Sequence, residues 1–477
     1  MIKLRNIISQ LEEDVFVTLS NQLNENKADK FLQLLKFYRE NKLSDENIMK
    51  ELDVKVNAFY TLKSRLFDKL QETLTSNLKT EIIDLLRQVS AIPDILYGYS
   101  PDLALAILTK LEKDLIQYDL PHELTKVYSA LKKLSVNTAK YYEYSQLQNR
   151  AVAYSLTIDK VEDFTSTLAQ KAGEYYLSKN EQTYSEMLFI KKEIENYCRL
   201  YSSHRLQIYA KISELNCYLC GADYKIQNPE LFFESAFKIF EEHHFDKNYQ
   251  YLKTAFHFLA FEYYMAENQV ERAKYHFYNL KKNISTFLNF KHSIFSTRYL
   301  NTLLEWSKQN DEEGELINAS LILEASFDPE PSSPIDYILY KKFQAITLYY
   351  QGKPELSKSI LHKLTNEVSF KNFPHAEIEI KLMLVYFILI TKPDPITESI
   401  LRSVYRKIKE REHEINYENA STFSKILKFK KNDNFEDRYI KLKELGERFE
   451  KENVGKSKML SCMKINSQFF NQLLKHQ

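Results

Sequence analysis

Apolar residues recur along most of the chain at the spacing of amphipathic helices. In the stretch ADKFLQLLKFYREN, the residues Phe31, Leu34, Leu35 and Tyr38 follow an i, i+3, i+4, i+7 pattern, and TEIIDLLRQVSAI repeats it. Because residues at this spacing share one face of a helix, each stretch predicts a helix with one buried side. Similar segments continue to the end of the chain, separated by short polar breaks. We therefore predict an all-α fold.

Proline-rich and polar breaks divide this helical pattern into regions. Residues 1–92 contain no proline, and we predict a small helical N-terminal domain over 1–95. Helical segments with short breaks fill 100–430, where the stretch FDPEPSSPID at 327–336 is the clearest loop. The last region, 431–477, ends in INSQFFNQLLKHQ, whose apolar residues predict helices that cap the stack.

Three stretches share a pattern that indicates internal repetition. YYLSKNEQTYSEMLFIKK, YYMAENQVERAKYHFYNL and LYYQGKPELSKSILHKL align on Asn180, Asn268 and Gly352, at intervals of about 84–88 residues, or two units of about 42–44. In each stretch, aromatic residues end one helix, and a Gly or Asn takes the left-handed position that stops it. A small residue and large apolar residues follow, for which the first copy offers Ser185 and Phe189.

This pattern resembles the tetratricopeptide (TPR) repeat, in which a Gly-containing turn between two helices is followed by an Ala and, four residues later, an aromatic residue. The period here is longer than that family's 34 residues, and one of the three turns has Gly. The resemblance implies antiparallel helix pairs stacked as a TPR-like α-solenoid that binds a protein or peptide partner in its concave groove. The candidate groove residues are aromatic residues near the helix ends: Tyr175, Tyr263, Tyr264, Tyr349 and Tyr350.

The stretch SDENIMKELDVKVNAFYTLKSRLFDKL, residues 44–70, predicts a short helix, a tight turn and a longer helix. Ser44 is a favourable N-cap, and Asp53 tolerates the left-handed backbone of a turn. The stretch resembles the DNA-reading helix-turn-helix of sigma factors. The resemblance implies major-groove contacts for one set of residues and phosphate contacts for another. The first set is Lys55, Asn57, Ala58, Tyr60, Thr61 and Ser64, and the second is Lys63, Arg65 and Lys69.

Two interpretations of residues 44–70 remain open. Acidic residues such as Glu46, Glu51 and Asp68 surround the basic ones and weaken attraction to phosphate. Short helix pairs with this apolar spacing also occur in many unrelated helical proteins. The pair is either a structural hairpin before the solenoid, or the DNA-binding part of a transcriptional regulator whose solenoid senses a ligand.

Charge and hydropathy limit the remaining classes of partner. The net charge is +1, from 66 basic and 65 acidic residues, so no global field draws the chain to nucleic acid or to an anionic membrane. The most apolar run, IKLMLVYFILI at 380–390, has about half the length needed to cross a bilayer and predicts a buried helix. The N-terminus lacks the apolar region of a secretory signal. We expect a cytoplasmic protein without a membrane partner.

The sequence contains no phosphate-binding glycine loop, no G-x-S-x-G and no H-E-x-x-H. Cys217 and Cys220 form a single CxxC, and the nearest further ligands, His243 and His244, depart from zinc-finger spacing. We predict that both cysteines are small apolar helix residues. We therefore expect a non-enzymatic scaffold or adaptor, with no cofactor and no metal.

Overall fold

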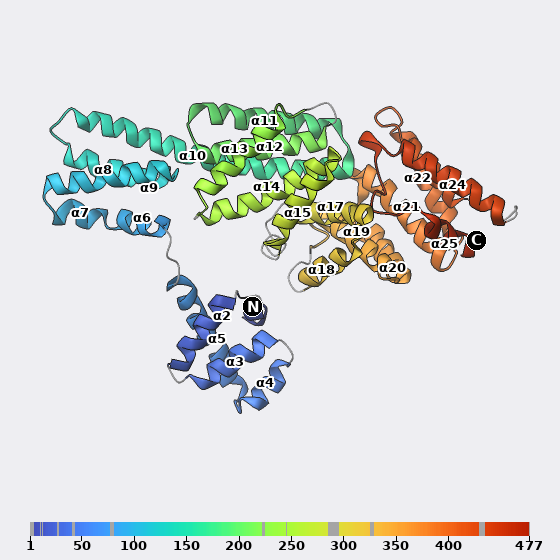
Figure 1. Cartoon of the computed structure of the whole chain (residues 1–477), viewed down its shortest axis with the longest axis horizontal. Coiled ribbons are helices and arrows are strands. Elements are labelled where there is room, and N and C mark those ends of the chain that lie inside the picture. The colour runs from blue at the N-terminus through green and yellow to red at the C-terminus, as the bar shows by residue number, and fades with distance from the viewer. Residues whose placement is uncertain are drawn as a thin grey trace. The chain divides into compact units, whose positions relative to one another are not determined.

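The computed structural model describes residues 4–9, 11, 13–25, 28–40, 43–76, 81–221, 225–244, 246–284, 295–324, 329–428 and 435–476. Every regular element within these residues is a helix, which confirms the predicted all-α fold (Figure 1). The chain forms two compact units. Unit 1 comprises residues 1–118 and 126–144, and unit 2 comprises residues 119–125 and 145–477.

The first five helices of unit 1 share one hydrophobic core. Helices α1 and α2 pack against α3, and α5 packs against α2 and α3. The amphipathic stretch predicted around residue 35 forms α3 and buries Leu34, Leu35 and Tyr38 as expected. The first nine helices, the last of which begins within residues 119–125 of unit 2, are α1 (Leu4–Ser9), α2 (Glu13–Glu25), α3 (Asp29–Glu40), α4 (Asp45–Glu51), α5 (Val56–Ser76), α6 (Glu81–Ser90), α7 (Ile92–Gly98), α8 (Pro101–Gln117) and α9 (Pro121–Leu134).

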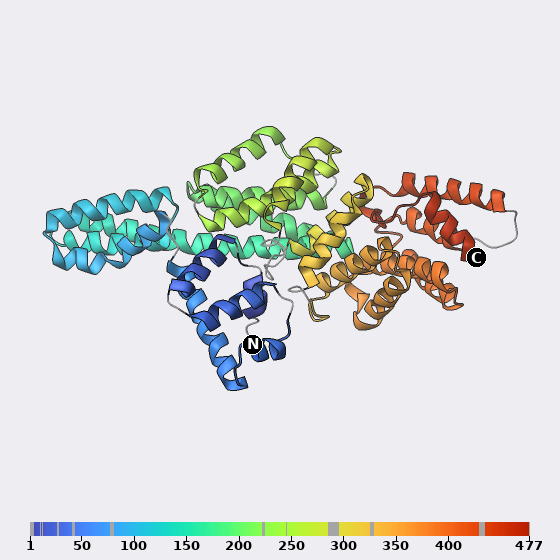
Figure 2. The ribbon, with the colours of Figure 1, turned by 60° about the horizontal axis from the view of Figure 1, so that its bottom comes forward.

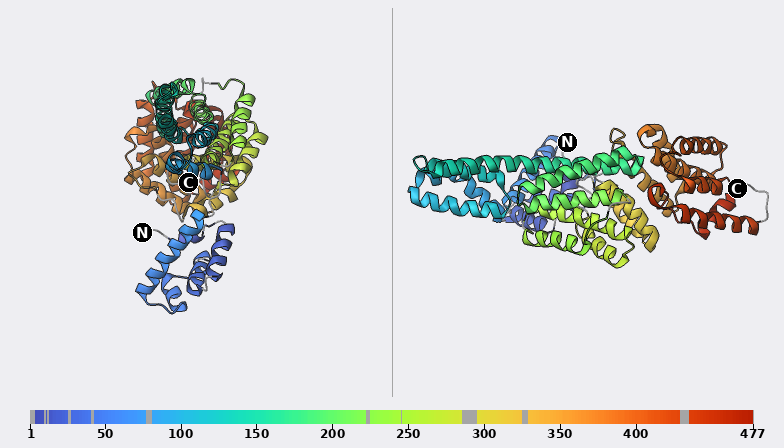
Figure 3. Two further views of the ribbon diagram at one scale, coloured as in Figure 1. Left: turned by 90° about the vertical axis from the view of Figure 1, so that its left-hand side faces the viewer. Right: turned by 90° about the horizontal axis from the view of Figure 1, so that it is seen from above.

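Unit 2 is a stack in which neighbouring helices pack in pairs, as α14/α15, α19/α20 and α21/α22 do (Figures 2 and 3). Two short 3-10 helices, η1 (Phe370–Asn372) and η2 (Gly455–Ser457), interrupt the series. The helices are α10 (Lys140–Ser178), α11 (Glu181–Leu200), α12 (His204–Cys220), α13 (Pro229–Glu242), α14 (Lys247–Ala266), α15 (Val270–Lys281), α17 (Ser296–Asn310), α18 (Glu313–Glu324), α19 (Pro334–Tyr350), α20 (Pro354–Glu367), α21 (Pro374–Thr391), α22 (Ile396–Glu410), α23 (Glu418–Leu427), α24 (Phe435–Glu452) and α25 (Ser467–His476).

The turns inside the helix pairs follow the predicted chemistry in two of three cases. Asn268 and Gly352 have positive φ angles of 55° and 75°, so they take the left-handed position that stops a helix. In the first copy the prediction for Asn180 was wrong. Lys179 takes the left-handed conformation there, with a φ of 55°. Asn180 is the N-cap of α11, and its side chain accepts a hydrogen bond from the backbone N–H of Gln182.

This shift changes which side of α11 is buried. The predicted packing of Ser185 and Phe189 was wrong, because Ser185 is exposed and Phe189 is 64% exposed. The buried residues are instead Thr183, Met187 and Ile190. A displacement of two positions turns a side chain about 200° around a helix, which moves it from one face to the opposite one. The alignment of the three stretches therefore did not predict the buried face of α11.

The most apolar segments are buried as predicted. The run at 380–390 forms most of α21, and its side chains are buried apart from that of Lys381. The apolar residues of α25 pack against α21 and α24, and the buried ones are Phe469, Phe470, Leu473 and Leu474. Over the described residues, no helix combines the length and apolar character required to span a bilayer.

Two predicted breaks coincide with helix ends. The break near residues 95–100 falls between α7 and α8, within unit 1. The described part of the Pro-rich stretch, residues 329–333, lies between α18 and α19, while residues 327 and 328 lie outside the described residues.

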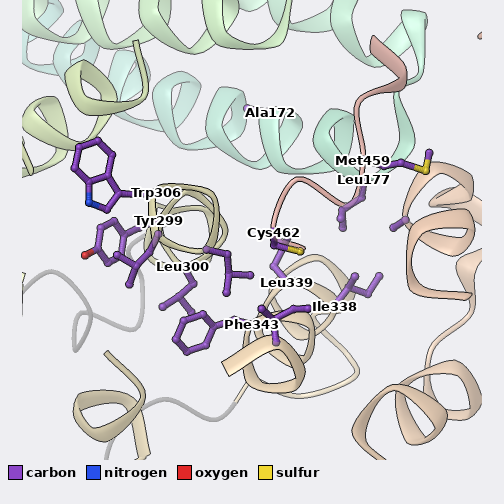
Figure 4. Close-up of a cluster of buried hydrophobic side chains, with 14 of the residues drawn as sticks. Ala172, Leu177, Tyr299, Leu300, Trp306, Ile338, Leu339, Phe343, Met459 and Cys462 are labelled. Carbon is purple, nitrogen blue, oxygen red and sulfur yellow. The ribbon is translucent and has the colours of Figure 1, made fainter. Parts of the chain in front are cut away.

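A largely irregular segment, residues 453–466, connects α24 to α25 and is anchored inside unit 2. The backbone N–H of Leu460 donates a hydrogen bond of 2.7 Å to Glu379 of α21, and the hydroxyl of Tyr350 donates one of 2.8 Å to the carbonyl of Cys462. Figure 4 draws Cys462 in one buried cluster with Leu177 of α10 and Leu339 of α19. The segment is therefore part of the core.

Candidate functional site

Unit 2 contains a cavity of about 180 Å³. Its walls come from α10, α12, α14, α17 and α19, and from Lys458 of the irregular segment. Ala172, Leu219 and Leu339 form apolar parts of the wall. The volume is several times the about 30 Å³ that one water molecule occupies in the liquid, so the cavity can hold a side chain or a small molecule.

One wall of the cavity carries a buried ion pair between Arg298 and Glu262. The Arg298 Nη2 atom lies 2.6 Å from Glu262 Oε2, and Nη1 donates a hydrogen bond of 2.7 Å to Asn216 Oδ1. Thr302 Oγ1 donates a hydrogen bond of 2.6 Å to Glu262 Oε1. Burial raises the pKa of the Glu262 carboxyl, and the Arg298 charge counteracts part of this effect. The network joins α12, α14 and α17 around the cavity.

A second ion pair compensates the other carboxylate of the wall. Lys458 Nζ lies 3.1 Å from Glu305 Oε2. Both residues line the cavity, so the pair links α17 to the irregular C-terminal segment at this point. Each carboxylate of the wall thus has its own cation.

Lys179 is a third cation in the cavity wall. Its ammonium lies 5.3 Å and 5.1 Å from the ring centroids of Tyr175 and Tyr176, within the range of cation–π attraction. In the part of the chain that the structure describes, no carboxylate forms an ion pair with it. Burial lowers the pKa of this ammonium. Lys179 therefore contributes a positive charge beyond the two that are paired with Glu262 and Glu305, although Glu305 and the nearby Glu379 also attract it.

Two buried polar atoms of the wall have neither a hydrogen bond nor an ion pair among the described residues. They are the hydroxyl oxygen of Tyr175 and the amide oxygen of Asn301. The side chains that carry them are 1% and 4% exposed. Asn301 Nδ2 donates to the carbonyl of Thr297 at 3.1 Å, which fixes the amide so that its oxygen is the free acceptor. Burying a polar atom without a partner costs about 1–3 kcal/mol, so both atoms favour a ligand that pairs with them.

Of the five tyrosines proposed for the groove, only Tyr175 lines this cavity. Tyr263 and Tyr264 are each 4% exposed, and Tyr264 stacks on His276 with an interplanar angle of 8°. Both rings therefore pack in the core. Tyr349 and Tyr350 are partly buried, and their hydroxyls bond to Gln472 at 2.8 Å and to the Cys462 carbonyl. These four rings hold unit 2 together in this structure.

The short helix, turn and longer helix predicted from residue 44 onward are α4, the turn at residues 52–55 and α5 of unit 1. Ser44 caps α4 by accepting a hydrogen bond from Asn47 N, and Asp53 has a φ of 49° in the turn, as expected for both. The apolar side chains of the two helices face the core of unit 1. They are Ile48, Leu52, Val54, Phe59 and Leu62.

The outer face of α5 is exposed to solvent. The exposed residues include Tyr60, at 55%, and most of those placed by the resemblance against DNA: Lys55, Asn57, Ala58, Thr61, Ser64 and Arg65. Acidic residues of the two helices are exposed as well, namely Glu46 and Glu51 of α4 and Asp68 of α5. The face therefore offers hydrogen-bonding side chains with mixed charge.

Lys63 differs from the other predicted DNA contacts because an acidic residue holds it. Its Nζ atom lies 2.9 Å from Asp45 Oδ2, and Arg5 binds the other oxygen of Asp45 at 2.6 Å. The hydroxyl of Tyr38 also donates to Asp45, at 3.3 Å. Lys63 thus stabilises the bundle of unit 1, and its charge is already compensated.

The CxxC lies at the end of α12. Cys217 is buried, and burial raises the pKa of its thiol to about 12. Cys220 is partly buried and lines the cavity. Over the described residues, no three His, Cys, Asp or Glu side chains converge as a metal site requires.

Comparisons with protein-family models, with curated proteins and with solved structures found no match to this chain.

The sequence analysis did not identify Lys179 and Asn301, two of the residues that line the cavity. For Lys179 a signal existed, because a long cation stands where the other two turns have Asn or Gly. For Asn301 there was none, since only tertiary packing decides which hydrogen bonds a buried amide makes.

Proposed function

We propose that the protein is a non-enzymatic, TPR-like helical-repeat scaffold or adaptor that holds a segment of a protein or peptide partner in the cavity of unit 2. The observation that carries this proposal is the combination of unpaired groups in one small cavity. These are the Lys179 ammonium, the Tyr175 hydroxyl and the Asn301 amide oxygen. Groups of this kind are costly to bury alone and become favourable when a ligand pairs with them.

The surroundings of the cavity support a binding role. Stacked helix pairs leave an inner surface along which an extended segment can lie. The apolar walls can cover the ligand, while the fixed polar groups set its orientation, as in most ligand sites of proteins. The Arg298–Glu262 network holds three of the wall helices in place, so the site is preformed.

A random peptide library displayed on phage and selected on the full-length protein tests this function. Ala266 is exposed and lines the cavity, so Ala266→Trp places a large ring at its opening without disturbing the core. We expect selected peptides to bind the unmodified protein and to lose binding to Ala266→Trp. Ala153 is also exposed but does not line the cavity, and Ala153→Trp is the matched control. Selected peptides that bind both variants equally would contradict the proposal.

A second candidate function is sequence-specific DNA binding by α4 and α5, in a regulator whose unit 2 senses a ligand. The specific observation in its favour is the exposed outer face of α5, which presents Asn57, Tyr60 and Thr61. Their positions match those that read base edges in the sigma-factor helix-turn-helix, which the pair resembles.

Selection of the full-length protein against random duplex DNA tests the second function. We expect an enriched motif whose binding falls at least tenfold in Tyr60→Ala. Tyr97 of α7 is 77% exposed and lies outside the helix pair, so Tyr97→Ala controls for the loss of a surface tyrosine. Failure to enrich any motif at low salt would exclude this function.

A further inference from the structure

Among the described residues that line the cavity of unit 2, two cations form ion pairs and one does not. Arg298 is paired with Glu262, and Lys458 is paired with Glu305. Lys179 has no carboxylate partner within the described residues, so the wall carries a net charge of about +1. An uncompensated buried charge is destabilising unless a counter-charge reaches it. The ligand that best completes this site is therefore a monoanion.

The uncharged groups of the site add a second requirement. The Tyr175 hydroxyl can donate a hydrogen bond to the same anion that Lys179 attracts. The Asn301 amide oxygen can only accept a hydrogen bond, and the hydrogen bond from its Nδ2 to the Thr297 carbonyl fixes the orientation of the amide. The ligand must then present an acceptor anion to Lys179 and Tyr175 and a donor, such as an amide N–H, to Asn301.

We propose that the cavity binds one acidic residue of a peptide, with its carboxylate on Lys179 and Tyr175 and an amide N–H on Asn301. This inference rests on the proposed function of unit 2 and names the chemistry of its ligand. The carboxylate can come from an Asp or Glu side chain or from the C-terminus of the peptide. A volume of about 180 Å³ suits a single residue of this kind.

A phosphate group fits the site less well than a carboxylate. A phosphorylated residue brings a charge of about −1.5 to −2, which exceeds the single unpaired cation. Glu262 and Glu305 line the same cavity and would repel the excess negative charge. A carboxylate brings one negative charge, which Lys179 neutralises.

The backbone at Lys179 supports a role for its side chain beyond folding. The residue has a φ of 55°, a conformation that Gly adopts at lower cost than any residue with a side chain. The side chain lies beside Tyr175 and Tyr176, whose rings attract the ammonium. A lysine in this strained position, in the wall of a cavity and without an ion-pair partner among the described residues, is explained by a ligand that it binds.

Ligand-observed NMR with four small probes tests the proposal on the full-length protein. N-acetylglutamate α-amide carries a side-chain carboxylate, and N-acetylalanine carries a terminal one. N-acetylglutamine α-amide is the neutral counterpart, and sodium acetate lacks the N–H. We expect one or both of the first two to bind, and the neutral amide and acetate to bind at least tenfold more weakly. The tighter of the first two identifies the source of the carboxylate. Equal binding of the neutral amide would overturn the proposal.

Variants of the protein locate the binding. We expect Lys179→Met to lower the affinity for the carboxylate probes at least tenfold, and Tyr175→Phe to lower it several-fold. Lys160→Met is the control, because the Lys160 ammonium also lies beside two rings, at 5.6 Å and 5.4 Å, but Lys160 does not line the cavity. Unchanged affinity in Lys179→Met would overturn the proposal. The comparison of charged and neutral probes needs no variant, so it decides the question even if Lys179→Met does not fold.

The outcome separates this inference from the function on which it rests. Library peptides that lose binding to Ala266→Trp but lack a required carboxylate would leave the peptide-binding function standing and refute the acidic specificity. If no library peptide depends on the opening at Ala266, the binding function itself fails, whatever the probes show.

Discussion

The ammonium of Lys342 lies 2.6 Å from the carboxylate of Glu379, and the two side chains are only 5% and 7% exposed. Burial by itself lowers the pKa of Lys342, but the adjacent Glu379 carboxylate outweighs it and raises the pKa above its usual value. The other oxygen of Glu379 accepts the backbone N–H of Leu460. The pair therefore joins α19 and α21 to the segment that brings Lys458 to the cavity.

Removal of one member of this pair should be strongly destabilising. We expect Lys342→Met to lower the free energy of unfolding of unit 2 by about 3–5 kcal/mol, because it leaves the Glu379 charge buried and unpaired. Urea unfolding followed by circular dichroism measures the change. The double variant Lys342→Met/Glu379→Leu should recover part of the loss, since no unpaired charge then remains.

The exposed pair of Lys363 and Glu367 is a matched control. Its atoms are 3.5 Å apart, and the side chains are 71% and 31% exposed. Exposed ion pairs contribute about 0–1 kcal/mol, so Lys363→Met should shift the urea midpoint little. A similar loss in both variants would show that burial does not set the energy of the Lys342–Glu379 pair.

The buried pair His257 and His276 should make the protein sensitive to acid. Their Nδ1 atoms are 2.9 Å apart. Burial, with the neighbouring His276, lowers the pKa of His257 to about 3, and burial, with Arg272, lowers the pKa of His276 to about 4. In the unfolded chain both have a pKa of about 6.5. The unfolded state therefore binds protons first, and stability falls as the pH drops from about 6.5 toward 4.

Each histidine should contribute up to about 1.4 kcal/mol per pH unit within this window. We expect His257→Asn to reduce the slope of stability against pH between 6 and 4, measured from urea midpoints at a series of pH values. His413 is exposed, so His413→Asn is the control and should leave the slope nearly unchanged. An unaltered slope in His257→Asn would mean that the pair is protonated in the folded protein.

Asp45 should stabilise the bundle formed by α1–α5. Burial alone would raise the pKa of its carboxyl, but the cations of Lys63 and Arg5 lower it overall. The stabilisation is therefore present above the unfolded pKa of about 3.9 and is lost as the pH falls below it. Because the side chain is 41% exposed, we expect Asp45→Asn to cost only about 1 kcal/mol at pH 7. Hydrogen exchange of α3 and α5 amides measures this loss, and no increase in exchange would contradict it.

Lys179→Gly should separate stability from binding. Glycine adopts the left-handed backbone at low cost, so we expect the free energy of unfolding to rise by about 0.5–1 kcal/mol. The same variant should no longer bind the carboxylate probes. Asn268 has the same φ of 55° in another turn outside the cavity. Asn268→Gly should stabilise without affecting probe binding. If Lys179→Gly still binds the carboxylate probes with unchanged affinity, Lys179 is not part of the binding site.

The pattern of apolar residues predicted the all-α fold, because the period of a helix is set locally and repeats in every segment. It also predicted the burial of α21 and α25, while the Asn and Gly residues of the repeated pattern predicted the turns at Asn268 and Gly352. The packing of α11 was predicted incorrectly, because its buried residues Thr183 and Met187 lie two positions before those that the alignment indicated.

The candidate site was mostly beyond the reach of sequence analysis. Tyr175 was proposed for a groove from its place at a helix end, and its ring does line the cavity, but Tyr263 and Tyr264 have the same pattern and lie in the core. Sequence alone determined the helices and the buried faces of several of them, which depend on neighbours a few residues apart. Only the tertiary structure decided which charges are paired, because the partners lie far apart in the sequence. Arg298 pairs with Glu262 and Lys458 with Glu305, while Lys179 forms no ion pair among the residues described.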